Sequence, residues 1–298
     1  MQPDSRFLDL TPVFWANVKT ISEALGYANR RARDGSGGDI KVHRMREIRQ
    51  AYRTLDLDAT HLFSSDGQPT EMGATLLAYF EHRADTLNTI AEPNLMDGPD
   101  AIIEYQRLLP ATPANHKVTL NKQKGDKAGP AMLTEMVNII LGNKLGSFDP
   151  NPQQLTTVTR DNLPVRTLSR RVDGAYPAAV NPVAIWEIKE YYFTTSFGSR
   201  VADGVYETML DGIELKELRD DTGIDVKHYL IVDGKYTWWG MGRSYLCRMV
   251  DLLHQGLVDE VLFGREVVTR LPRIADELLQ LHPHETNQVP VFELEDPR

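Results

Sequence analysis

Residues 170–193, RRVDGAYPAAVNPVAIWEIKEYYF, contain the stretch that decides the fold. VAIWEIKEYYF is the most strand-like run in the chain, and its apolar residues on both sides of the backbone are typical of a strand that is buried on both faces. The segment RRVDG before it is predicted to be a strand that ends at Asp173. The turn AYPAAVNP between them is expected to join the two strands as a hairpin.

Three charged side chains of this hairpin are expected to meet. Glu187 and Lys189 are two residues apart and therefore share one face of the strand. Charged groups on an apolar strand are costly to bury unless they have partners or a metal. The hairpin can bring Asp173 beside Glu187, and two converging carboxylates repel each other unless a cation lies between them. Ligand sets of oxygen alone favour Mg²⁺ or Mn²⁺ over zinc.

Asp173 followed by Glu187-Ile188-Lys189 resembles the catalytic core of the PD-(D/E)XK phosphodiesterase superfamily, which includes the type II restriction endonucleases. The resemblance covers roughly residues 130–265. It implies a restriction-endonuclease-like mixed β-sheet flanked by helices, in which an acid on one strand and an acid-x-Lys on the next hold a divalent metal and a hydrolytic water. A glutamate on the preceding helix often completes such a site, and Glu135 occupies that position here. The sequence departs from the family pattern at Val172, where the family has proline.

The resemblance assigns a role to each of these residues. Asp173, Glu187, Lys189 and Glu135 would be catalytic, and the metal would be held by Asp173, Glu187, the Ile188 carbonyl and Glu135. Mg²⁺, with Mn²⁺ as a substitute, would polarise the phosphate and lower the pKa of bound water. Lys189 would hold that water and stabilise negative charge, with a pKa that the low-dielectric pocket could lower.

As a string of letters the acid-x-Lys motif is not specific, because it occurs five times in this chain. The strongest competitor is Asp233–Lys235, which ends the apolar strand HYLIV. Gly234 within it predicts a tight turn, however, and no strand that ends in an acid precedes it suitably. A salt-bridged strand pair in an unrelated α/β domain is the alternative interpretation of Glu187–Lys189.

Apolar periodicity gives the rest of the architecture. The first 110 residues are predicted to be mainly helical, for DNA recognition or dimerisation. A helix that opens at Gly129-Pro130 and closes near Gly142 leads into the strands, and helices over 198–218 and 242–257 alternate with strands over 227–234 and 259–264. An α/β nuclease core over 111–270, with a sheet covered on both faces, and an acidic tail over 271–298 complete the predicted organisation.

Charge is unevenly distributed in this acidic chain, which carries 33 Lys and Arg against 42 Asp and Glu. Each basic stretch is either a solvated face or a track for DNA phosphates. Ser199 and Arg200, at the start of a predicted helix, either bind phosphate or form a simple cap. The residues considered for DNA binding are Arg44, Arg46, Arg49, Arg53, Lys117, Lys122, Lys124, Lys127, Arg170, Ser199 and Arg200.

Several classes of protein are excluded by composition. The single cysteine, Cys247, rules out a disulfide framework, and no apolar run approaches the roughly 20 residues that span a bilayer. The chain lacks GxxxxGK[ST], so no nucleotide cofactor is expected. With no secretory signal visible at the first residues, we expect a cytoplasmic protein without a membrane partner.

The leading hypothesis is a Mg²⁺-dependent endonuclease that cuts double-stranded DNA at a specific sequence, as type II restriction enzymes do. One site per chain and two strands to cut predict a homodimer. Two alternatives stay open at this point. One is a non-catalytic DNA- or protein-binding module on the same fold, and the other is a nonspecific nuclease of repair or anti-phage defence.

Overall fold

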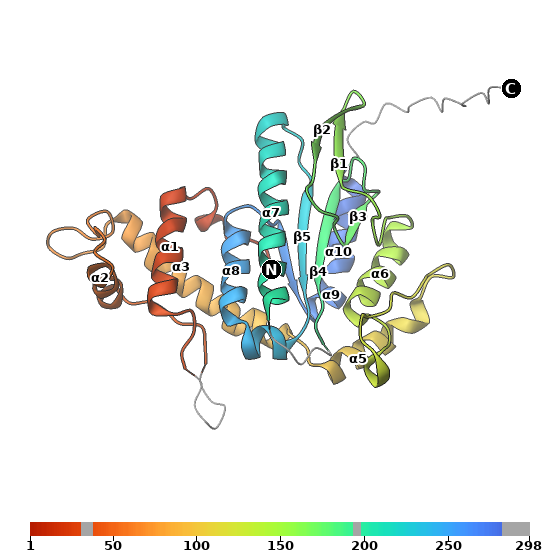
Figure 1. Cartoon of the computed structure of the whole chain (residues 1–298), viewed down its shortest axis with the longest axis horizontal. Coiled ribbons are helices and arrows are strands. Elements are labelled where there is room, and N and C mark those ends of the chain that lie inside the picture. Colours follow the sequence, from red (N-terminus) through yellow and green to blue (C-terminus); the bar gives the residue numbers. More distant parts are fainter. Residues whose placement is uncertain (31–37, 193–197, 282–298) are drawn as a thin grey trace.

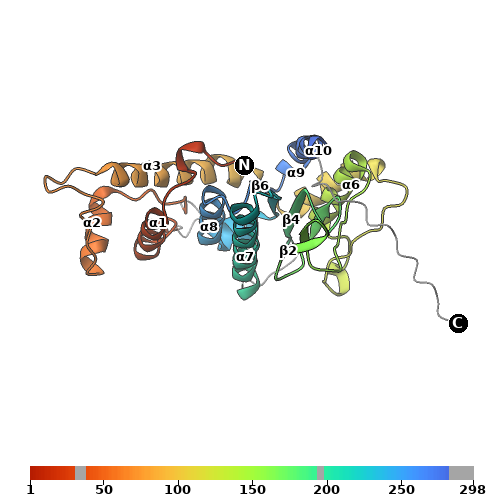
Figure 2. The same ribbon diagram turned by 90° about the horizontal axis from the view of Figure 1, so that it is seen from above.

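The computed structural model describes residues 1–30, 38–192 and 198–281. They form an elongated molecule, with a helical N-terminal region at one end and a mixed sheet with flanking helices beside it (Figures 1 and 2). The predicted α/β architecture with a helical N-terminal region is thus confirmed. None of the helices within these ranges is both long and apolar enough to cross a bilayer.

The N-terminal region contains α1 (Pro12–Leu25), α2 (Met45–Thr54) and α3 (Glu71–Thr86). The hydroxyl oxygens of Thr11 and Thr70 cap α1 and α3 by accepting a hydrogen bond from the N–H three residues on. The apolar faces of these helices bury a core rich in aromatic rings, among them Phe14, Tyr79 and Phe80. Through a π-helical segment, η2 (Leu87–Ala91), and the short α4 (Glu92–Asn94), α3 continues towards the sheet (Figure 2).

A four-stranded sheet in the order β3-β4-β5-β6 forms the centre of the second region. β3 (Gly174–Tyr176) runs antiparallel to β4 (Ala184–Lys189), whereas β5 (Lys227–Val232) and β6 (Glu260–Phe263) run parallel to β4. The parallel pairs need crossover connections, which α7 (Ser199–Thr222) and α8 (Arg243–His254) provide. A separate ribbon of β1 (Thr157–Arg160) and β2 (Leu163–Thr167) turns at Asp161 and Asn162, both in the left-handed conformation.

Helices cover both faces of this sheet, and the alternation of side chains along each strand decides what each residue meets. Trp186 of β4 and Ile231 of β5 pack against α6 (Met132–Leu145) and α10 (Leu271–Gln280). Leu230 of β5 packs against α7 and α8 on the opposite face. Glycine is required at 174, because a Cβ there would lie 2.2 Å from the Trp186 indole.

Shorter elements complete the described ranges. α5 (Gly98–Leu108) packs against α6, and α9 (Glu266–Thr269) lies between β6 and α10. Three 3₁₀ turns and a second π-helical segment connect the longer elements: η1 (Ser5–Phe7), η3 (Leu109–Ala111), η4 (Gly125–Lys127) and the π-helical η5 (Lys235–Met241).

The structure differs from the sequence-based expectations at three boundaries. α5, which we expected in the N-terminal region, buries Ala101 and Tyr105 in the core of the sheet domain. Residues 271–280, expected to belong to a tail, form α10, whose Ile274 and Leu278 face the same core. The rest of the predicted tail consists of residue 281, which the structure describes, and residues 282–298, which lie outside the described residues. Asp173 immediately precedes β3 and does not end the strand before it.

Candidate active site

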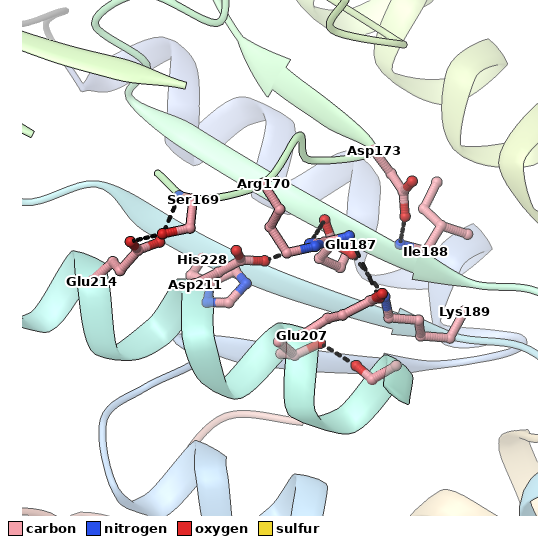
Figure 3. A network of polar contacts seen from close by, with 12 residues as sticks. Ser169, Arg170, Asp173, Glu187, Ile188, Lys189, Glu207, Asp211, Glu214 and His228 are labelled. Carbon is pink, nitrogen blue, oxygen red and sulfur yellow. Dashed lines mark hydrogen bonds and ion pairs between the residues drawn. The ribbon is translucent and has the colours of Figure 1, made fainter. Parts of the chain in front are cut away.

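Asp173 meets the acid-x-Lys segment at the start of β3. Gly174 of β3 pairs with Trp186 of β4, so the residue before Gly174 lies beside the end of β4 that carries Glu187 and Lys189. The carboxylate of Asp173 accepts a 2.8 Å hydrogen bond through Oδ2 from the backbone N–H of Ile188, the residue between that pair (Figure 3). The hairpin therefore brings the aspartate and the glutamate–lysine pair together.

Glu187 and Lys189 form an ion pair on the face of β4 that α7 covers. The Nζ of Lys189 donates to Glu187 Oε2 at 2.7 Å, and the exposed fractions of the two residues are 5% and 0%. The aliphatic part of Lys189 packs over Gly204 of α7, where a Cβ would lie 3.2 Å from Lys189 Cδ. Burial of both charges together, with a hydrogen bond between them, meets the condition under which an ion pair can be tolerated in a protein interior.

Two acids of α7, Glu207 and Asp211, complete a polar cluster with Arg170 that sequence reasoning missed. Arg170 Nη1 lies 2.7 Å from Asp211 Oδ2 and 2.8 Å from Glu187 Oε1. Glu207 Oε2 lies 3.1 Å from Lys189 Nζ and 3.5 Å from Arg170 Nη2 (Figure 3). The acids of α7 recur every three to four residues from 207 onward, a spacing that places them on one face of a helix. This spacing is the signal in the sequence that could have indicated the cluster.

The same face of α7 holds the segment that leads into β3. Ser169 donates from its hydroxyl to Glu214 Oε1 at 2.6 Å and from its backbone N–H to Glu214 Oε2 at 3.0 Å. One strand earlier, Arg166 pairs with Glu217 at 3.1 Å. The two contacts of Ser169 with Glu214 fix the position of the chain just before Asp173, whereas Arg166 holds the β1-β2 ribbon to α7.

The electrostatics of the cluster shift the pKa values of its carboxyl groups in different directions. The Asp173 side chain is exposed on one side, but the protein that surrounds the rest of its carboxyl, together with the charge of Glu187, raises the pKa of Asp173 to about 6. Burial and the charge of Glu187 likewise raise the pKa of Asp211 to about 7. Burial opposes the ionised form of Glu187, but Lys189 and Arg170 outweigh it and lower the pKa of Glu187.

Lys189 is a protonated ammonium in this cluster. Its burial acts against the charge, but the carboxylates of Glu187 and Asp173 outweigh that effect and raise the pKa of Lys189 to about 12. The expectation that the pocket lowers this pKa is therefore wrong, because the pocket is apolar along the lysine stem and anionic at its tip. Lys189 can donate hydrogen bonds and stabilise negative charge, but it cannot act as a base near neutral pH.

The donor set fits a magnesium ion held by few protein ligands. In the described part of the chain, no group of three His, Cys, Asp or Glu side chains is placed to hold a metal. Mg²⁺, however, is usually bound through one or two carboxylates together with waters and substrate phosphates. Glu187 Oε1 is buried and accepts no aligned hydrogen bond from any described residue, so it has capacity for a cation. Asp173, Glu187 and the Ile188 carbonyl would hold the ion.

Glu135 is not brought into this group. It lies on α6, which covers the sheet face occupied by Trp186, whereas Glu187 points to the opposite face. Both of its oxygens are engaged by the loop before α6: His116 Nε2 lies 2.7 Å from Oε2, and the Thr119 N–H donates to Oε1 at 2.7 Å. The place of Glu135 in the sequence, on the helix before the strands, suggested a metal ligand. In the structure its carboxylate anchors the loop of residues 116–131.

The side chains of the competing pair Asp233–Lys235 have different partners and do not form one site. Asp233 is fully buried and accepts hydrogen bonds from the Trp238 indole N–H at 2.8 Å and from the Tyr191 backbone N–H. Lys235 points elsewhere and pairs with Glu92 at 2.5 Å. The structure therefore explains this acid-x-Lys string by local packing.

The residues considered for DNA binding fall into separate places. Arg170 belongs to the acid cluster, and Ser199 is the exposed first residue of α7, while the side chain of Arg200 lies outside the description. Arg49 packs over the Phe63 ring and donates to the Gly67 carbonyl, so its guanidinium is engaged within the N-terminal region. The remaining candidates are exposed, on or next to α2 and in the 116–131 loop: Arg44, Arg46, Arg53, Lys117, Lys122, Lys124 and Lys127.

Comparison with known proteins divides the chain near the same place as the structure. Residues 96–278 match a family described as Domain of unknown function (DUF7687), and residues 1–90 match a second one, Domain of unknown function (DUF7690). The boundary between them falls just before α5, in agreement with the packing of that helix on the sheet domain. No curated protein and no solved structure matches this chain.

Proposed function

We propose that this chain, which belongs to the DUF7687 family, is a Mg²⁺-dependent endonuclease that hydrolyses phosphodiester bonds of double-stranded DNA. The observation that carries the proposal is the contact between Asp173 and the backbone of the Glu187-Ile188-Lys189 segment. It brings two carboxylates, a carbonyl and an ammonium close together in a mixed sheet, and these groups can serve metal-assisted phosphoryl transfer.

The topology is in keeping with the proposal. After α6 and the β1-β2 ribbon, the antiparallel pair β3-β4 is followed by two parallel strands linked by helices, in the order α7, β5, α8 and β6. The resemblance to the PD-(D/E)XK superfamily implies a mixed sheet flanked by helices with the acid-x-Lys pair on one of its strands, and β4 carries that pair. Fold alone does not define a function, so the proposal rests on the side chains of the site.

Each side chain has a role that follows from its environment. When bound, Mg²⁺ would supply charge to the phosphate and lower the pKa of a bound water. Asp173 reaches solvent and can turn its second oxygen outward while Ile188 fixes the first. Lys189 remains charged in a buried position, where it is fixed by two carboxylates and can stabilise negative charge that grows on the phosphate.

The most direct test is incubation of the purified protein with plasmid DNA and Mg²⁺ or Mn²⁺. Discrete fragments are expected for a sequence-specific, restriction-like enzyme acting as a homodimer. A smear would instead assign the protein to the nonspecific nucleases of repair or defence. Intact DNA under both metal ions would refute the nuclease proposal and favour a binding module.

The loop of residues 116–131 is proposed to contact the DNA backbone. Its lysines are exposed, the loop is held to α6 by Glu135, and the bridge between Leu120 and Pro130 closes the loop on itself. A double substitution, Lys122→Gln with Lys124→Gln, is expected to weaken DNA binding and to reduce the slope of log affinity against log salt by about 2, because each phosphate contact contributes about 0.9.

Fluorescence anisotropy with a duplex at several salt concentrations measures this slope. The control is Lys216→Gln on α7, which removes an exposed lysine paired with Asp220 at 3.2 Å. An unchanged slope in the double variant, with the wild-type protein binding DNA, would exclude the loop from the interface.

A further inference from the structure

Arg170 stands between the candidate metal ligand Glu187 and the acids of α7. Its Nη1 contacts Asp211 Oδ2 at 2.7 Å and Glu187 Oε1 at 2.8 Å, and its Nη2 lies 3.5 Å from Glu207 Oε2 (Figure 3). The side chain is 23% exposed, so the guanidinium also borders solvent. One residue thus connects the buried oxygen of Glu187 with solvent.

The contacts of Arg170 are not equivalent. Its N–H group is aligned with Asp211 Oδ2 as a hydrogen bond, whereas Glu187 Oε1 accepts no aligned hydrogen bond from any residue within 1–30, 38–192 and 198–281. The other oxygen of Glu187 is already bonded to Lys189. Arg170 is therefore anchored by its aligned hydrogen bond to Asp211, whereas its contact with the Glu187 oxygen that a metal would need is a 2.8 Å ion pair.

We propose that Arg170 and the divalent metal compete for Glu187 Oε1, and that Arg170 becomes a ligand of the substrate phosphate once the metal is bound. When a metal is bound, the guanidinium would give up Glu187, stay attached to Asp211 and Glu207, and turn the freed N–H of Nη1, with the N–H groups that α7 does not engage, to the phosphate. A planar guanidinium matches phosphate oxygens in a bidentate way. This inference rests on the proposed nuclease function and makes Asp211 and Glu207 positioning residues.

The competition predicts opposite changes in two measurements on the full-length Arg170→Gln variant. Removal of a competing charge next to the ligand oxygen should tighten Mn²⁺ binding about tenfold, as measured by isothermal titration calorimetry without DNA. Loss of the phosphate contact should slow plasmid cleavage about 100-fold. A purely structural arginine would lower metal affinity and cleavage together.

Arg166→Gln is the matched control. Arg166 also pairs with an acid of α7, at 3.1 Å from Glu217, and its side chain is 25% exposed, but it makes no contact with Glu187. This variant should keep the wild-type Mn²⁺ affinity and the wild-type cleavage rate. If Mn²⁺ affinity rises in both variants, the loss of any nearby positive charge would explain the tighter binding, and the proposal would be overturned.

Arg170→Lys keeps the test decisive if the glutamine variant does not fold. The lysine retains the charge, so Mn²⁺ affinity should stay near that of the wild type, while the loss of the planar fork lowers cleavage. Unchanged or weaker Mn²⁺ binding in Arg170→Gln, or full cleavage by Arg170→Lys, overturns the inference. Wild-type protein that neither binds Mn²⁺ nor cuts DNA would instead refute the proposed function itself.

Discussion

An Asp173→Asn variant is expected to cleave plasmid DNA about 1,000-fold more slowly than the wild type, because a neutral amide cannot replace a carboxylate that holds the metal. The fold should be unaffected. Asp173 is exposed, and the carbonyl oxygen of asparagine can still accept the hydrogen bond from the Ile188 N–H, which is 2.8 Å long in the wild type. Cleavage rates and thermal melting of the purified variant measure the two effects separately.

Asp225→Asn provides the control for this variant. Asp225 belongs to another acid-x-Lys string, pairs with Lys227 at 2.5 Å and precedes β5, at the end of the strand away from Lys189. Its substitution also removes one negative charge from an ion pair of the sheet domain, but the cleavage rate should stay within about twofold. Equal cleavage by Asp173→Asn and the wild type would remove Asp173 from the active site.

The largest expected effect on stability comes from Arg83→Met, at the junction of the helical region and the sheet domain. Arg83 of α3 is fully buried and pairs with Asp251 of α8 at 3.0 Å, while its Nη2 donates to Ser22 Oγ at 3.0 Å. After the substitution, the buried Asp251 carboxylate keeps its 2.6 Å hydrogen bond from the Tyr79 hydroxyl but loses the positive charge of Arg83. We expect a loss of about 3–5 kcal/mol in the free energy of unfolding.

Urea denaturation monitored by tryptophan fluorescence measures this loss. The control is Arg107→Met, which removes an arginine that is 68% exposed at the side chain and pairs with Glu104 at 3.0 Å. Surface pairs of this kind contribute at most about 1 kcal/mol, so the control should change the free energy of unfolding by less than that amount. Similar losses in the two variants would contradict a large contribution of the buried Arg83–Asp251 pair to stability.

Local elements and the central motif could be predicted from the sequence alone. The apolar period of three to four residues predicted a mainly helical N-terminal region together with α6, α7 and α8, and the run around Glu187 predicted β4. The spacing of two residues placed Glu187 and Lys189 on one face, as the structure has them. These features depend on neighbours within a few residues, whose geometry the backbone of a helix or strand fixes.

The tertiary structure alone decided which charges meet. The recurrence of acids along α7 is visible in the sequence, but only the crossover from β4 to β5 places Asp211 and Glu207 opposite Arg170 and Lys189. The same packing puts Glu135 on the other face of the sheet. A local pattern states which face of an element is polar, whereas the partner of that face is set by non-local packing of segments far apart in the chain.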